Sequence, residues 1–174
     1  GQINWDSQNA SIIAAARAGS AVVVKSAGNA GVAMDRSYVD NMGRQRFDYL
    51  GRDLVGLKGT IFVGALTSNG SKSSKAVLAS YSNRAGTNKR IQNQFLVVGV
   101  PAHIHGLSGT SFAAPVVAGY AAILGSKFPK AKPQAIARQL LTTARRDTIQ
   151  DYNRMIHGRG EASLNRALAP KRIR

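Results

Sequence analysis

Three short runs of nonpolar residues constrain the fold of this chain more than any other feature. They span residues 21–25, 60–67 and 95–100 and show no alternation of polar and nonpolar side chains. A strand that is nonpolar on both sides must be covered on both sides, as happens in parallel sheets. The chain is therefore expected to be an α/β protein with a mostly parallel sheet.

The segments around these runs predict helices and loops. Asp6 and Ser7 offer an N-cap for a helix that ends at Gly19, and further helices are expected from Pro133 and over 162–168. Two other segments complete the prediction. Residues 34–53 have no clear period and are expected to form a long surface loop, whereas residues 76–82 are expected to form another strand.

The composition favours one compact domain and excludes several kinds of protein. A chain of 174 residues is about one domain, and without cysteine it can hold neither a disulfide nor a thiolate metal site. No nonpolar run is long enough to cross a bilayer, so no membrane span is expected. The basic tail at 170–174 is expected to be solvated.

The formal net charge of +16 is not taken as a sign of nucleic-acid binding. The lysines and arginines are scattered along the chain, and no aromatic residues are interleaved with them as a platform on which bases would stack. We therefore expect no nucleic-acid partner. A basic nucleic-acid-binding domain remains the least favoured alternative, and a steep loss of DNA binding with salt would reveal it.

The segment 108–115, Ser-Gly-Thr-Ser-Phe-Ala-Ala-Pro, is the strongest candidate for a reactive site. It predicts a tight glycine turn that leads into a small-residue helix, with Pro115 in the first turn, where proline is tolerated. That helix is expected to be buried on nearly all sides. Ser111 would then lie at the positive end of the helix dipole, which stabilises negative charge. The alternative is that Thr110 or Ser111 merely caps the helix.

A second candidate follows the first buried run. Ser26-Ala27-Gly28-Asn29 forms a turn from which the amide of Asn29 can point into a cleft at the carboxyl end of a strand. Asparagine and glycine are also common in turns that have no function, so the motif alone does not decide.

Taken together, these motifs resemble the subtilisin-like serine proteases. Gly-Thr-Ser-x-Ala-x-Pro at 109–115 is similar to the segment of the catalytic serine, and Ala27-Gly28-Asn29 to the oxyanion turn. Further segments are similar in the same order along the chain, at 61–65, 78–83, 97–101 and 158–162. The resemblance implies a three-layer α/β fold with a central helix after the serine. It covers the C-terminal portion of that domain, and 34–53 is expected to be a surface insertion.

The resemblance also implies the chemistry. Ser111 would be the nucleophile of a serine endopeptidase, and the side chain of Asn29 would donate a hydrogen bond to the oxyanion. In this family the catalytic Asp and His precede the oxyanion turn, whereas here only Asp6 and no histidine does so. His103, His105 and His157 are interpreted as structural or surface residues. The Asp and His are therefore expected on a preceding segment, without which this chain is inactive.

Several further expectations rest on the resemblance alone. The substrates would be proteins or peptides, a propeptide or inhibitor is a candidate partner, and the site of action would be extracellular or at the cell envelope. The resemblance names no definite cofactor, and calcium is its one candidate. The carboxylates of 34–53 are candidates for Ca²⁺, although Asp–Arg pairs in a solvated loop are favoured over a metal site. The alternative function is a non-catalytic module that binds or scaffolds a partner. Without its preceding segment, the chain is expected to expose an unpaired sheet edge.

Overall fold

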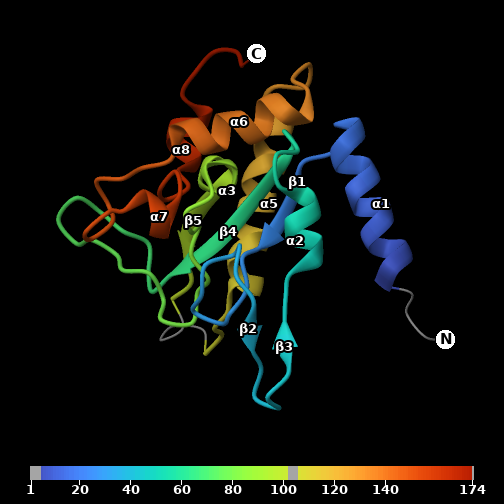
Figure 1. The fold of residues 1–174 in the computed structure, drawn as a ribbon. Helices are drawn as coiled ribbons and strands as arrows, with labels where there is room; N and C mark the ends of the chain where they lie inside the picture. Colours follow the sequence, from blue (N-terminus) through green and yellow to red (C-terminus); the bar gives the residue numbers. More distant parts are fainter. Residues whose placement is uncertain (1–4, 102–105, 174) are drawn as a thin grey trace.

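The computed structural model describes residues 5–101 and 106–173 and is built around a parallel sheet (Figure 1). The sheet has the strand order β1-β4-β5, with β1 at Val23–Ser26, β4 at Thr60–Leu66 and β5 at Phe95–Gly99. Val23 pairs with Thr60, and Phe62 pairs with Phe95. The expected α/β fold with a parallel sheet is confirmed.

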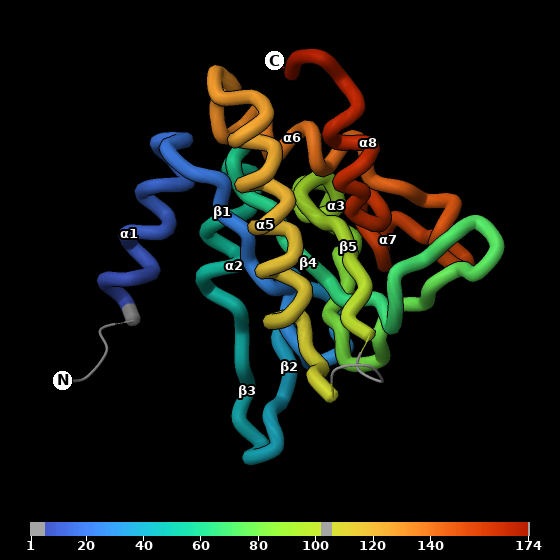
Figure 2. Tube along the Cα trace, turned by 180° about the vertical axis from the view of Figure 1, so that it is seen from behind, coloured from blue at the N-terminus to red at the C-terminus, as the bar shows by residue number. Residues whose placement is uncertain are grey.

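Helices cover both faces of this sheet and produce three layers. Side chains alternate along β4, so that Ile61 and Val63 pack on one face and Phe62 on the other. The first face carries α5 (Thr110–Lys127), α6 (Pro133–Thr143) and α8 (Leu164–Leu168), with α5 in front of the strands in Figure 2. The second face carries α1 (Trp5–Ala18), α2 (Tyr49–Leu54) and α3 (Lys89–Gln94). A short helix, α7 (Arg154–His157), packs against α3 and β5.

Strand β1 lies at one edge of the sheet. It pairs with β4 alone among the described residues, and its four residues are only half-buried, whereas all of β4 is buried. Helix α1 beside it buries little of its own surface, with Ala16 as its buried residue and Ile12 exposed. The described part of the chain thus has the unpaired sheet edge that was expected from the sequence.

Three of the local predictions are wrong. Residues 34–53 are not an irregular loop, because β2 (Tyr38–Val39) and β3 (Gln45–Arg46) form an antiparallel hairpin that is followed by most of α2. Residues 76–82 form only isolated bridges, since Ala76 pairs with Ile149 and Leu78 with Leu66 instead of with one continuous strand. Asp6 lies within the first turn of α1, which begins at Trp5, and not at its cap.

Helix α5 is less buried than its composition predicts. One stripe faces the sheet, and its buried members are Thr110, Ala113, Val117, Ala121 and Leu124. The opposite side is open, so that Phe112 is 42% exposed and Ile123 is 45% exposed. The reason is that the described residues provide a covering layer on one side of this helix only. Nonpolar surface therefore remains on α5 on the side away from the sheet.

None of the described helices is both long enough and nonpolar enough to cross a membrane.

Candidate functional site

The turn after β1 is held in shape by the buried side chain of Asn83. Its Nδ2 donates to the carbonyl of Ala27 at 2.9 Å, and its Oδ1 accepts from the N–H groups of Ala30 and Val32 at 3.0 and 3.1 Å. Gly28, within this turn, has a φ of 104°, and a Cβ there would lie 2.6 Å from the Asn83 amide. Asn83 therefore fixes the backbone on both sides of Asn29.

We expect the isosteric substitution Asn83→Asp to destabilise the protein by about 2–4 kcal/mol, because the donor to Ala27 is lost and a charge is buried. Thermal or urea unfolding measures the effect. Asn165→Asp is the matched control, because Asn165 is exposed and makes no side-chain hydrogen bond in the described structure, and it should leave stability within about 0.5 kcal/mol. Equal unfolding curves for the two variants would contradict the role of Asn83.

The start of α5 packs directly against this turn. Gly109 precedes the helix with a φ of 126°, a conformation that side chains other than glycine rarely adopt. Thr110 then makes three contacts across about 80 residues of sequence. Its N–H and its Oγ1 donate to Oδ1 of Asn29 at 2.8 and 2.9 Å, and its Oγ1 accepts from the N–H of Gly28 at 3.0 Å. The residue before Ser111 is thus bonded to Asn29.

These contacts leave two donors available at one place. Both hydrogen bonds to the Asn29 side chain use its oxygen, and no described residue accepts a hydrogen bond from its Nδ2. The N–H of Ser111 lies in the first turn of α5, where a helix offers no acceptor of its own. The side chains of Asn29 and Ser111 are both exposed. This arrangement can stabilise an anion through an amide donor, a backbone donor and the helix dipole.

Two hollows adjoin these residues. Ser111 lines a cavity of about 530 Å³ between β1 and α5, together with Lys25, Ser26 and Ala118. Asn29 lines another of about 880 Å³, whose opposite wall is the β2–β3 hairpin and includes Asn41. The segment 34–53 thus forms a wall of the hollow that adjoins the turn at Gly28 and Asn29.

The one described histidine, His157, does not line the hollow of Ser111. His157 is 4% exposed at the end of α7, where its ring stacks on Tyr152 and its Nδ1 lies 3.1 Å from the N–H of Asn153. Burial lowers the pKa of His157 below its ordinary value, so it is a neutral structural residue, as the sequence predicts. His103 and His105 lie outside the described residues.

Three of the four carboxylates of 34–53, those of Asp40, Asp48 and Asp53, form ion pairs with arginine or lysine side chains. Asp40 bonds with Arg44 and Arg46, both at 2.9 Å, and the hydrogen bonds that it accepts lower its pKa to about 2. Asp48 forms an ion pair with Lys25 and accepts from the N–H of Gly51. Among residues 5–101 and 106–173, no group of three or more His, Cys, Asp or Glu side chains could hold a metal ion.

Sequence reasoning missed the roles of three residues at this site. The motif that contains Asn83 was recognised. Its hydrogen bonds to a turn more than 50 residues away could not be predicted, because the residues around Asn83 do not indicate them. Thr110 was considered only as a helix cap. Lys25 lies in a nonpolar run, yet its ammonium group donates to the carbonyl of Ser26 and pairs with Asp48 beside the Ser111 hollow. A lysine inside a buried run was the available clue.

A comparison with protein families finds that the model of the subtilase family matches residues 1–166. A comparison with curated proteins finds no match.

Solved structures of proteases share the fold. The patellamide maturation protease PatA is 21% identical with a TM-score of 0.58, over 96% of this chain and 56% of that chain. Fervidolysin from Fervidobacterium pennivorans, a keratinolytic enzyme related to subtilisin, is 24% identical with a TM-score of 0.57, over 93% of this chain and 24% of that one. A structure of the subtilase cytotoxin SubAB is 18% identical with a TM-score of 0.60, over 96% of this chain and 55% of that chain. The chain spans about half the length of the first structures that it matches, and it is a partial domain.

Proposed function

Because this chain belongs to the subtilase family, we propose that it is part of a serine endopeptidase in which Ser111 is the nucleophile and Asn29 binds the oxyanion. One observation carries the proposal. Thr110 holds the oxygen of the Asn29 amide, so that the amide nitrogen is available beside the residue that follows Thr110, which is Ser111. An exposed amide is thus hydrogen-bonded, through its oxygen, to the residue that precedes an exposed hydroxyl at the start of a helix, which supports the proposal.

The reaction follows from this arrangement. The Oγ of Ser111 bonds to the carbonyl carbon of a peptide while its proton passes to a base, and the carbonyl oxygen becomes an oxyanion. Nδ2 of Asn29 and the N–H of Ser111 donate to that oxyanion. The intermediate then breaks its C–N bond, the amine leaves with the proton from the base, and an acyl-enzyme remains. Water hydrolyses the ester by the same steps.

The base and its orienting carboxylate are proposed to lie on a further segment that packs against this chain. Support comes from the uncovered surfaces beside Ser111, namely the outer edge of β1 and the exposed side of α5. The hollow that Ser111 lines opens between these two elements. A strand laid along β1 would pair its free backbone groups and bring a histidine to that hollow.

Covalent labelling with a fluorophosphonate tests both parts of the proposal, because this reagent requires an activated serine. The 174-residue chain alone should show no labelling above that of Ser111→Ala. The same chain produced together with a segment that carries the Asp and His should be labelled at Ser111. Labelling of the chain alone would contradict the need for a second segment. Absence of labelling in the folded assembly would contradict the protease function itself.

A further inference from the structure

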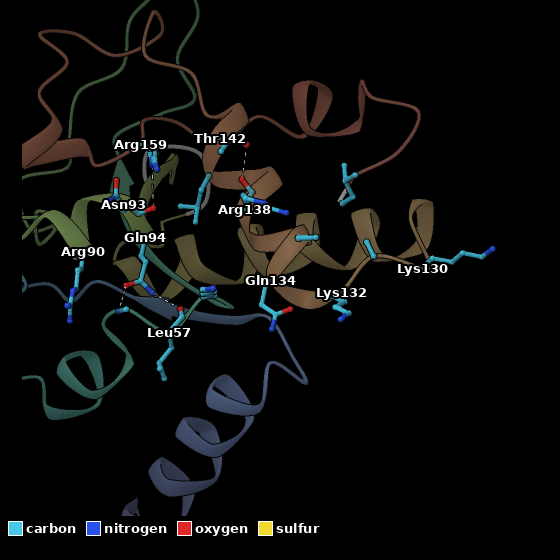
Figure 3. A pocket seen from close by; sticks show the side chains of 16 residues that line it. Leu57, Arg90, Asn93, Gln94, Lys130, Lys132, Gln134, Arg138, Thr142 and Arg159 are labelled. Atoms are coloured by element: carbon cyan, nitrogen blue, oxygen red, sulfur yellow. Dashed lines mark hydrogen bonds between the residues drawn. The ribbon is translucent and has the colours of Figure 1, made fainter.

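A second kind of site lies at the amino-terminal ends of the strands, whereas Ser111 and Asn29 follow their carboxyl-terminal ends. A cavity of about 790 Å³ is lined by residues that precede β4 and β5, by the connection between α5 and α6, and by α6 itself (Figure 3). Because the strands are parallel, residues that precede β4 and β5 lie together at the amino-terminal ends of the strands. A volume of this size is typical of cavities that bind small molecules.

The lining of this cavity includes nonpolar side chains, here called the floor, and cationic side chains, here called the rim. None of the residues that line it is an aspartate or glutamate. The floor includes Leu57, Ala135 and Leu141. The rim carries six cationic side chains, which come from five separate segments of the chain: Lys58, Arg90, Lys130, Lys132, Arg138 and Arg159.

Arg159 is the member of the rim that is hardest to explain without a ligand. It is half-buried, and its Nε donates to the backbone carbonyl of Asn93 at 3.4 Å (Figure 3). Burial, together with repulsion from Arg154 and Arg146, lowers the pKa of Arg159. No described carboxylate forms an ion pair with it. The half-buried Lys25 and Arg145, in contrast, are paired with Asp48 and Asp147.

An unpaired cation that is partly removed from water costs free energy unless an anion meets it. Several cations around one hollow would repel one another for the same reason, and they would together attract a ligand with more than one negative charge. The planar donors of arginine and the ammonium groups of lysine are the groups that proteins use to bind phosphate oxygens. The nonpolar floor would suit an uncharged portion of the same ligand.

We propose that this cavity binds a small anion with two or more phosphate groups, its phosphates on the cationic rim and any nonpolar portion on the floor between Leu57 and Leu141. The proposal is independent of the protease chemistry, since none of its residues lines the hollows beside Ser111 and Asn29. Two sources share the required chemistry, inorganic polyphosphate and nucleoside polyphosphates.

Calorimetric titration of the 174-residue chain with inorganic tripolyphosphate and with ATP, both in EDTA, tests the proposal. We expect one equivalent of either probe to bind, and tighter binding of ATP would assign part of the affinity to the floor. The triple variant K58Q/R90Q/K132Q should bind at least 100-fold more weakly, because each lost charge-assisted contact is worth about tenfold. The matched control R36Q/K75Q/R166Q removes the same charge from exposed residues outside the cavity and should bind within about threefold of the wild type.

A separate variant distinguishes a ligand contact from a structural role. Arg159→Gln should lower the affinity about tenfold and leave the melting temperature of the free protein unchanged or higher, because an uncompensated charge is removed. A fall in melting temperature with unchanged affinity would overturn the assignment. So would an equal loss of binding in the control triple variant, or the absence of binding by both probes. Duplex DNA is also titrated as a competitor class: if it binds more tightly than either probe and both triple variants weaken its binding equally, the cations form a general nucleic-acid-binding surface and not a specific cavity site.

Discussion

Under the proposed function, replacement of Ser111 by alanine is expected to lower the kcat of the proposed assembly by roughly 10⁶-fold, the loss known for removal of the triad serine of subtilisin. The reason is that no acyl-enzyme can form once the Oγ is absent. Substrate binding should change little, since the hydroxyl is a small part of the surface that contacts the peptide. Hydrolysis of a chromogenic peptide by the assembly, with and without the substitution, measures the effect.

Ser108→Ala is the control for this prediction, because Ser108 is also exposed and lies three residues before Ser111. It should retain activity within about threefold of the wild type. If Ser111→Ala keeps more than a few per cent of the activity while Ser108→Ala loses it, the nucleophile has been assigned to the wrong hydroxyl. If both variants are fully active, the activity comes from another protein in the sample.

Asn29→Ala is expected to lower kcat by about 10²–10³-fold, which is the magnitude for loss of one oxyanion donor in a related enzyme. The amide nitrogen acts mainly on the charge of the transition state, so KM should remain nearly constant. Removal of the side chain also frees the N–H and Oγ1 of Thr110, which now donate to the Asn29 oxygen. Steady-state kinetics on the assembly separates kcat from KM.

Asn41→Ala is the matched control, because Asn41 lines the same hollow as Asn29 but lies on the hairpin wall. It should leave kcat within about threefold and affect mainly KM. Thr110→Val adds a second comparison. It keeps the backbone donor to Asn29 but removes the hydroxyl that bonds both Asn29 and Gly28, so an intermediate loss of about tenfold in kcat is expected. A large rise in KM with unchanged kcat for Asn29→Ala would contradict the oxyanion role.

The sheet was predictable because each of its strands is indicated by the residue types within the strand itself. Residues 60–67 and 95–100 are nonpolar without alternation, and they form the two fully buried strands. The hairpin at Tyr38–Arg46 was not predictable in the same way, because strands of two residues that are exposed to water have no nonpolar pattern. The same holds for α3, whose six residues are too few to show a helical period.

The candidate site was also predictable only where a short motif indicates it. The two motifs that contain Asn29 and Ser111 were recognisable from their residues, and the structure brings the first against the residue that precedes the second. The clamp by Asn83 and the ion pair between Lys25 and Asp48 were not recognisable, because each joins positions that are more than 20 residues apart. The partial burial of α5 depends on which layers cover it, and residue types do not reveal this.

The bonds of Thr110 to Gly28 and Asn29 have one more consequence. They fasten the turn at Gly28 and Asn29 to the start of α5, so the two residues proposed to bind the oxyanion belong to one hydrogen-bonded unit. Under the proposed assembly, proton transfer is supplied by one polypeptide portion and anion binding by the other. Cleavage of peptides then requires both portions at once, and the dissociation constant between them sets the protein concentration at which proteolysis switches on.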